Sequence, residues 1–444
     1  MNQGVPSYSK IWHVSAPIIL SLLAQNIINV TDTAFMGRVG EVELGASAIA
    51  GLFYVAVFML GFGFSTGTQI MIARRNGESE HKQIGGIFDQ SAYFFLLLAV
   101  FIFIFIYFFG AYFLEKIVSS KAVFQASKEY LQIRVWGIFF AFGNLAFRAL
   151  LVGVTNTRAL GYSALIMAVV NIIFDYLFIF GHYGFPEMGI AGAALASVIA
   201  EAVSFLFFVF YVRLKLNVKQ FQLFRFPKIN FSIIKSTLSL SVYIMLQYFL
   251  SLTSWFAFFA IIEQMGERPL AISNIIRSIY MVLVIPIMGL STATSSLVSN
   301  AIGEGFKEDV MHIINRLMKI SLISVLPFIL LIWILPKQMI RIYTNSPALI
   351  ADSVSSLYIV SGAILIFAVA MIVFSGVSGT ANTKTALAIE VLTLIVYLAY
   401  IYWIVIVKHS SVAMAWTSEY VYMFLLSLFS YWYLKRGNWR LKKI

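Results

Sequence analysis

Two stretches of the chain are similar to each other, GFSTGTQIMIARRNGE at residues 63–78 and GLSTATSSLVSNAIGE at residues 289–304, an offset of 226 residues. Two further pairs match at the same offset: GE at 40–41 with GE at 266–267, and GVTNTR at 153–158 with GTANTK at 379–384. Three matches at one offset, spread widely along the sequence, are not expected by chance. The sequence therefore predicts two homologous halves.

The composition excludes an ordinary soluble protein. Hydrophobic residues make up 61% of the 444 residues and charged residues 11%, and the mean hydropathy is +0.89. A bilayer core of about 30 Å needs roughly 20 apolar residues per helical span, and runs of that length recur along the whole chain. We therefore expect an all-α integral membrane protein with twelve transmembrane helices. The chain has no cysteine, which excludes disulfides, thiolate metal sites and cysteine nucleophiles.

Apolar runs bounded by charged or turn residues give the positions of the spans. The predicted spans are 11–35, 46–72, 85–110, 129–153, 160–181, 189–212, 233–262, 272–300, 311–335, 353–378, 386–407 and 411–434. Lysine and arginine favour the loops on one side of these spans, by 20 to 8. Because basic residues mark cytoplasmic loops, both termini and the loop from Arg213 to Lys235 are predicted to be cytoplasmic. The N-terminal span is expected to be retained rather than cleaved as a signal peptide.

The repeat and the spans together predict two lobes. Each half holds six spans, an even number, so both halves have the same orientation. We expect an N-terminal six-helix lobe over residues 1–215, a basic cytoplasmic linker over 216–232 and a C-terminal six-helix lobe over 233–444. Parallel repeats of this kind are an architecture of transporters, with the substrate site at or near the interface between the halves.

Several motifs resemble the multidrug and toxic compound extrusion (MATE) transporters. They are Pro17 followed by DTAFMG at 32–37, the duplicated Gly-Glu ends of helices 2 and 8, GVTNT at 153–157 and GIAGAALAS at 189–197. The resemblance covers essentially the whole chain in order. It implies a V-shaped pair of six-helix lobes that extrudes organic cations or other amphipathic compounds against an inward flow of Na⁺ or H⁺. The concentration of membrane acids in the N-terminal half resembles the DinF-type branch.

Asp32 is the principal candidate for the coupling chemistry. A charged side chain at bilayer depth costs roughly 2.5–3.5 kcal/mol on insertion scales, so each one is a functional candidate. Gln25, Asn29 and Asp32 recur at helical spacing and form a polar stripe. Asn171 and Asp175 are four residues apart and share one face of their helix. A carboxylate takes a proton or ligates Na⁺, and an amide oxygen beside a carboxylate suits Na⁺.

The resemblance implies a fuller coupling site around these acids. It places Asn171 and Asp175 opposite Asp32, and it adds a hydroxyl and a backbone carbonyl of the sixth span. The matching positions here are Ser197, where relatives often have Thr, and Ala193. Asp32, Asn171 and Asp175 are the expected ligands if the coupling ion is Na⁺. An incoming Na⁺ or proton and a cationic substrate would compete for the same negative charge.

Other acidic residues in the spans, and one helix-breaking proline, have more than one interpretation. Pro17 is expected either to let helix 1 bend as the pocket is protonated or to hold a static kink. Glu419 and Glu201 are candidates for a second functional acid, and Glu201 is equally compatible with a structural role. Glu390 is expected either to snorkel to the cytoplasmic face or to be a further functional acid.

The C-terminal half lacks the acid of the Na⁺-coupled NorM-type branch. The position of that helix 7 acid is taken by Ser251, and Asp32 maps through the repeat to Phe258. Polar and aromatic residues that could line a substrate cleft, with rings suited to cation–π contacts, are Gln25, Asn29, Gln247, Ser251, Trp255 and Phe258.

The expected function is therefore a secondary active antiporter that exchanges cationic or amphipathic compounds for H⁺ or Na⁺. The alternative is a flippase of lipid-linked oligosaccharides on the related two-lobe scaffold. Such a flippase should carry several cavity-facing basic residues, whereas only Arg134, Arg148 and Arg277 lie inside the predicted spans. No nucleotide loop, metal cluster or nucleophile–base pair indicates an enzyme. We expect no cofactor and no nucleic-acid partner, only small-molecule substrates and membrane lipid, and a monomer in the plasma (inner) membrane.

Overall fold

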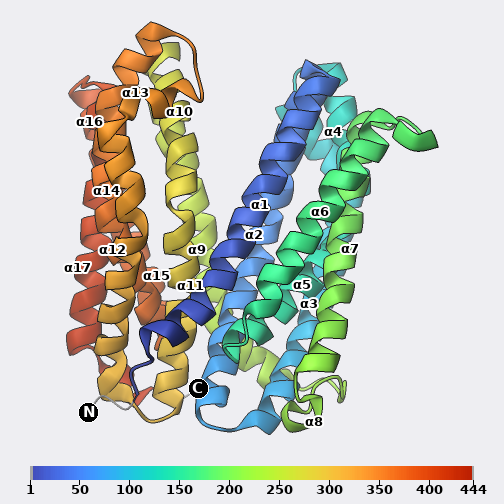
Figure 1. Cartoon of the computed structure of the whole chain (residues 1–444), viewed down its shortest axis with the longest axis vertical. Coiled ribbons are helices and arrows are strands. Elements are labelled where there is room, and N and C mark those ends of the chain that lie inside the picture. The colour runs from blue at the N-terminus through green and yellow to red at the C-terminus, as the bar shows by residue number, and fades with distance from the viewer. Residues whose placement is uncertain (1–3, 443–444) are drawn as a thin grey trace. The chain divides into compact units, whose positions relative to one another are not determined.

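The computed structural model describes residues 4–442, and this part of the chain is helical without strands. The helices of the first half are α1 (Tyr8–Val39), α2 (Glu41–Gly77), α3 (His81–Ile117), α4 (Lys121–Arg134), α5 (Gly137–Gly153), α6 (Arg158–Phe180), η1 (His182–Gly184), α7 (Gly189–Lys215) and α8 (Val218–Phe221). Those that follow are α9 (Phe231–Glu263), α10 (Glu267–Leu283), α11 (Ile285–Gly303), η2 (Lys307–Asp309), α12 (Val310–Ile334), α13 (Pro336–Arg341), α14 (Pro347–Gly379), α15 (Thr383–Tyr402), η3 (Trp403–Val407), α16 (Val412–Trp416), α17 (Ser418–Arg436) and η4 (Asn438–Leu441) (Figure 1).

The prediction of twelve spans is confirmed within residues 4–442. Ten helices are long and apolar enough to cross a membrane, and the number reaches twelve if each of two bent helix pairs counts as one span. Large apolar side chains point outward from these helices, such as Leu97 and Phe108 on α3 and Ile323 on α12, each at least 67% exposed. A surface of this kind is stable only against lipid. The chain is therefore a multi-pass membrane protein.

Two spans that the sequence predicts as single helices are broken. The pair α4 and α5 bends by 51°, and the pair α10 and α11 bends by 45°. Pro286 accounts for the second break, because proline removes a helical hydrogen bond and clashes with the preceding turn. The equivalent residue in the first half is Leu60, and α2 is continuous there. The first break, at Trp136 and Gly137, has no proline.

The repeat is visible in the backbone as well as in the sequence. Thr155 and Ala381, which are 226 residues apart, both have left-handed backbone conformations, with φ of 57° and 67°. Gly153 packs so closely on α2 that an added Cβ would lie 2.6 Å from the Ile72 side chain. Its repeat partner Gly379 packs on α11 in the same way, with the Ser295 carbonyl oxygen 2.7 Å from the added Cβ. Both turns therefore depend on the same close helix contact.

The described chain divides into two compact units. Ala16–Met245 form one unit, which we call the N-terminal unit, and the residues before Ala16 together with those after Met245 form the C-terminal unit. The divisions fall inside α1 and α9. The first lies next to Pro17, the one proline in the interior of α1.

Small residues set the packing of the N-terminal unit. Ala24 and Ile28 of α1 are buried against Ala164 and Ala168 of α6, and small residues of this kind let membrane helices approach closely. Gly192 of α7 faces the backbone of α6, where no side chain would fit. Figure 1 shows α6 and α7 running side by side. These contacts bring the polar faces of α1 and α6 together.

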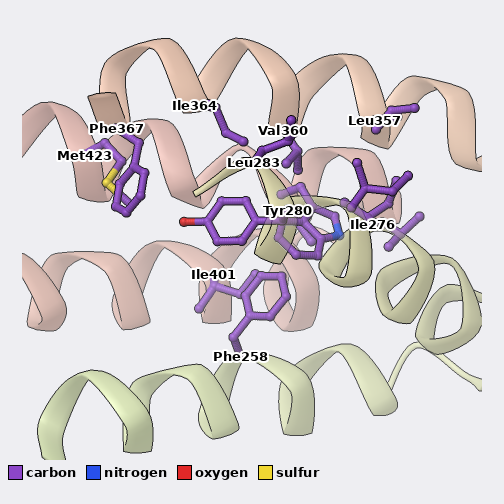
Figure 2. Packing of buried hydrophobic residues seen from close by; sticks show 14 of the residues in the cluster. Phe258, Ile276, Tyr280, Leu283, Leu357, Val360, Ile364, Phe367, Ile401 and Met423 are labelled. Carbon is purple, nitrogen blue, oxygen red and sulfur yellow. The ribbon is translucent and has the colours of Figure 1, made fainter. Parts of the chain in front are cut away.

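The C-terminal unit has an apolar core built from aromatic and branched side chains. Phe258 of α9 is fully buried there and stacks near Trp255, Trp416 and Tyr397. Figure 2 shows Phe258 in this core beside side chains of the neighbouring helices, including Tyr280.

The segment between the two halves is held against α3. The buried carboxylate of Asp89 accepts hydrogen bonds from the backbone N–H groups of Phe224, Arg225 and Phe226 at 2.9–3.2 Å. Gln90 accepts a further bond from the N–H of Asn230 at 2.8 Å. A buried acid with three N–H donors needs no coupling role, so Asp89 is accounted for by the anchoring of this segment.

Candidate functional site

The acids of α1 and α6 meet through an amide. With the Asn171 amide oriented so that its nitrogen faces the acids, the nitrogen lies 3.0 Å from Oδ1 of Asp32 and 3.3 Å from Oδ2 of Asp175. This orientation satisfies both partners, whereas the reverse one sets oxygen against oxygen. The two carboxyl groups therefore lie on either side of one amide group, within a single site. Two acids that share one buried site do not both ionise readily, so the site favours binding of a proton or another small cation.

The cluster is shielded from its surroundings but not fully sealed. Asn171 and Asp175 are buried, at 1% and 0% exposure, whereas Asp32 is half-buried. Oδ1 of Asp175 is buried and accepts no hydrogen bond from the described residues. The cluster thus combines two acids joined by one amide with a carboxylate oxygen that has no hydrogen-bond partner in the described part of the chain. Such a pair can bind a proton or another small cation, because carboxylate oxygens accept protons and are also ligands of hard metal ions.

The two residues that the resemblance adds lie on α7. Ala193 is buried in a cluster with Met36 of α1 and Ile179 of α6, each one turn beyond an acid of the site. Ser197 is half-buried one turn further along α7.

Glu201 has a different surrounding from the two aspartates. Its carboxylate forms a two-pronged ion pair with Arg134, at 2.8 Å and 2.6 Å. The guanidinium also lies over the ring of Tyr54, 3.9 Å from its centroid. The charge of Glu201 is therefore neutralised inside the protein by Arg134.

The three arginines inside the spans each lie over an aromatic ring. Besides Arg134, Arg148 lies 4.7 Å from the ring centroid of Phe62, and Arg277 lies 5.1 Å from that of Phe259. Contacts of this kind fix the guanidinium groups within the helix packing.

The polar residues that precede Asp32 on α1 are more exposed than Asp32 itself. Gln25 and Asn29 are exposed, which suits the polar stripe predicted from their spacing. Pro17 lies inside α1, and the backbone of α6 approaches it at Gly161, where an added Cβ would be 3.6 Å from the proline Cα.

Two acids of the C-terminal unit are buried among hydroxyl groups. Oε1 of Glu390 accepts hydrogen bonds from Ser251 at 2.8 Å and from Tyr422 at 2.7 Å. Glu419 accepts a bond from Tyr397 at 3.3 Å. Glu390 is only 2% exposed, so the prediction that it snorkels to the membrane face is wrong: the hydroxyl donors hold it inside.

The other cleft candidates of α9 lie in the packed interior or at its border. Gln247 is buried and Trp255 is half-buried, with its ring 5.7 Å from that of Tyr280. Phe258 is fully buried in the core.

Sequence reasoning missed one tyrosine near the ion pair of Arg134 and Glu201. Tyr54 is buried, and its ring lies against the guanidinium of Arg134. The signal that could have found it is an arginine in an apolar span, since a buried cation requires an acid and favours aromatic neighbours.

Comparison with known proteins gives a family for this site and fold. The MatE family profile matches residues 17–177 and 244–403, two segments whose spacing agrees with the repeat. The chain is 30% identical over 317 residues to the "Probable multidrug resistance protein NorM" of Agrobacterium fabrum, covering 68% of this chain and 67% of that protein. It is 26% identical over 407 residues to the protein of the same name from Thermotoga maritima, covering 88% and 84%.

Solved structures share the fold. One described as the outward-facing conformation of a multidrug resistance MATE family transporter superimposes with a TM-score of 0.88 at 19% identity, covering 96% of this chain and 94% of that one. A transporter from Pyrococcus furiosus, described as having a binding pocket of reverse polarity, gives a TM-score of 0.87 at 20% identity, covering 98% and 96%. The family match covers well over half of the chain, and the chain therefore belongs to the MatE family of multidrug-efflux (MATE) transporters, which are transporters and not enzymes.

Proposed function

We propose that this transporter is an antiporter that exports cationic or amphipathic compounds in exchange for H⁺ or Na⁺, with the coupling ion bound at Asp32, Asn171 and Asp175. The observation that carries the proposal is the contact of both carboxyl groups with the same amide. Two acids in one low-dielectric site cannot both carry a charge without a neutralising cation. A proton, Na⁺ or a cationic substrate can each supply that charge.

Exchange follows from this competition. When the coupling ion occupies the pair, the negative charge that would attract an organic cation is neutralised. When the ion leaves, the charge is restored and a cation can bind. Ala193 and Ser197 are proposed to complete the ion's ligands, and Pro17 to let α1 bend between the two states. The polar residues Gln25 and Asn29 are proposed to face the substrate.

The division of roles agrees with the DinF-type branch. In the C-terminal unit, Glu390 and Glu419 are bonded by tyrosine and serine hydroxyls. The arrangement of an amide between two carboxyl groups is found in the N-terminal unit. We propose that coupling resides in the N-terminal lobe, within a monomer of two lobes, 1–215 and 233–444, joined by a linker at 216–232. We further propose that it lies in the inner membrane with both termini cytoplasmic.

The test is efflux of a fluorescent organic cation, ethidium, from liposomes that hold the purified protein. A pH or Na⁺ gradient is imposed, and the wild type is expected to move ethidium against its own gradient. Asp32→Asn and Asp175→Asn should abolish the gradient-driven component, because each removes the charge over which the ions compete.

The matched control is Asp352→Asn, which removes an exposed acid paired with Arg268 at the surface. Its efflux should equal that of the wild type. Absence of gradient-driven efflux in the wild type, or its persistence in Asp32→Asn, would contradict the proposal.

A further inference from the structure

The segment that joins α7 to α9 carries a concentrated positive charge. Between Arg213 and Lys235, both included, the sequence has six basic residues and no acid. All six side chains are exposed, and none forms an ion pair with an acid within residues 4–442. They are Arg213, Lys215, Lys219, Arg225, Lys228 and Lys235. We call residues 213–235 the linker surface.

Large apolar side chains are interleaved with these charges. Leu214 and Phe231 are each 78% exposed, and Phe226 and Ile229 are more than half exposed. Apolar side chains gathered at an exposed site indicate a binding surface. Basic and apolar side chains together suit a membrane interface, where the charged groups meet lipid phosphates and the apolar groups enter the acyl layer. A soluble anion would use the charges but leave the apolar side chains in water.

Helix α3 holds the backbone of the linker surface in place. The buried carboxylate of Asp89 accepts hydrogen bonds from three of its backbone N–H groups. The side-chain amide of Gln90 donates to the carbonyl of Lys228 at 3.1 Å, and the hydroxyl of Tyr93 donates to the carbonyl of Pro227, also at 3.1 Å. These contacts use backbone groups of the linker surface, so its basic side chains remain available to a partner. The charges are therefore presented in a fixed arrangement.

The ends of two spans place this surface at a face of the membrane. Helices α7 and α9 are both long and apolar enough to cross a bilayer. The linker surface begins in the last turn of α7 and extends into the start of α9. Figure 1 shows α8, the short helix within this segment, beside the end of α7. Basic side chains next to the end of a span lie within reach of the headgroup layer.

We propose that the linker surface binds anionic phospholipids, whose phosphate groups contact the basic side chains while Phe226 and Ile229 lie beside the acyl chains. A zwitterionic headgroup carries its own cation, whereas an anionic headgroup has a net charge that complements the six basic residues. Because the attractions of several lysines and arginines add, the lipids next to this surface should be enriched in the anionic class. The inference uses no residue of the coupling site and does not depend on the proposed function.

A single label on the linker surface tests the proposal directly, because the sequence has no cysteine. Gln220→Cys places one thiol at an exposed position of α8, to which bimane is attached in the full-length protein. The labelled protein is reconstituted into vesicles of phosphatidylglycerol and phosphatidylcholine in equal amounts, with one of the two lipids brominated near its headgroup. Bromine quenches the label at short range, so comparison of the two brominated lipids identifies those beside the surface. Quenching by brominated phosphatidylglycerol should exceed that by brominated phosphatidylcholine by roughly threefold, and high salt should lower this excess.

Two sets of substitutions in the labelled protein separate charge from apolar contact. Lys219→Gln with Arg225→Gln and Lys228→Gln should lower the excess by roughly twofold or more, because half of the basic residues are lost. Phe226→Ser with Ile229→Ser should weaken quenching by both lipids and keep the excess. The matched control neutralises three exposed basic residues outside the linker surface and should keep both quenching values. Its substitutions are Lys121→Gln, Lys337→Gln and Arg341→Gln.

Equal quenching by the two lipids in the labelled protein would overturn the inference, and so would an excess that survives the triple substitution in the linker surface. Displacement of brominated phosphatidylglycerol by inorganic phosphate at constant ionic strength would assign the surface to a soluble anion and would also overturn it. The lipid preference and its salt dependence are measured on the labelled protein with all six basic residues, so the test stays decisive even if a multiple variant fails to fold.

Discussion

The amide of Asn171 is the smallest unit of the proposed mechanism, because it bonds the two acids at once. Asn171→Ala should leave both carboxyl groups without this donor and lower the exchange rate about tenfold, in line with the cost of an unmade buried hydrogen bond. Ethidium efflux under a fixed gradient measures the change. Asn274→Ala is the control, since that amide only bonds the carbonyl of Leu270 within its own helix. Equal effects of the two substitutions would contradict a specific role for Asn171.

The acids of the C-terminal unit should behave as structural hydrogen-bond acceptors. Glu390→Leu removes the acceptor of Ser251 and Tyr422 and should lower the free energy of unfolding by about 1–3 kcal/mol. Glu390→Gln keeps an acceptor and should cost less. Thermal unfolding in detergent measures the stabilities of the two Glu390 variants. Glu419→Gln should leave the ion dependence of exchange unchanged, and a shift in that dependence would make Glu419 a second coupling acid.

At this scale the sequence could identify the acids but not their pairing. Helical spacing placed Asn171 and Asp175 on one face, and the cost of a membrane charge singled out Asp32. The Arg134–Glu201 pair joins residues 67 positions apart on different helices. Periodicity within one helix carries no information about such a partner, so Glu201 had two open interpretations.

Helix α1 is the element in which movement is expected. Pro17 interrupts its hydrogen bonding, and the two compact units divide next to it. Pro17→Ala should stiffen the helix, lower the initial rate of exchange and leave the half-maximal ion concentration unchanged. Initial rates at saturating and limiting ion concentration separate the two quantities. An unchanged rate would assign Pro17 to a static kink.

The repeated turns make a prediction about helix packing. Gly153→Ala and Gly379→Ala should each destabilise the protein by about 1–3 kcal/mol, because the new Cβ meets a neighbouring helix at 2.6–2.7 Å. Gly45→Ala in α2 is the control, since nothing lies within 4 Å of its added Cβ. In detergent, the unfolding temperatures of the two repeat variants should be similar to each other and well below that of the control. A large difference between them would contradict equivalent packing.

Most helices could be predicted from apolar runs, and their breaks only in part. The proline at 286 could have indicated the break between α10 and α11, whereas the bend between α4 and α5 lies at Trp136 and Gly137 and has no such signal. Gly137 leaves room for the Arg134–Glu201 pair. The bend is therefore tied to a tertiary contact, which a hydropathy pattern cannot report.

The whole molecule is a duplicated scaffold with different polar interiors in its halves. The offset of 226 residues recurs in the backbone at Thr155 and Ala381, so the duplication was predictable from sequence. The acidic residues are not repeated at this offset. The residue that matches Asp32 is Phe258, which is buried in the apolar core of the C-terminal unit. In the proposed mechanism, the ion chemistry therefore resides in one of the two copies.

The central claim, that substrate and coupling ion compete for the charge of Asp32 and Asp175, is tested most directly by ion release from purified protein. Ethidium is added to weakly buffered protein in detergent, and released H⁺ is followed with a pH dye or released Na⁺ with a radioactive tracer. The account predicts that ethidium releases one of these ions from the wild type and from Asp352→Asn, and none from Asp32→Asn. Ethidium binding that releases neither ion from the wild type, or equal release from Asp32→Asn, would contradict it.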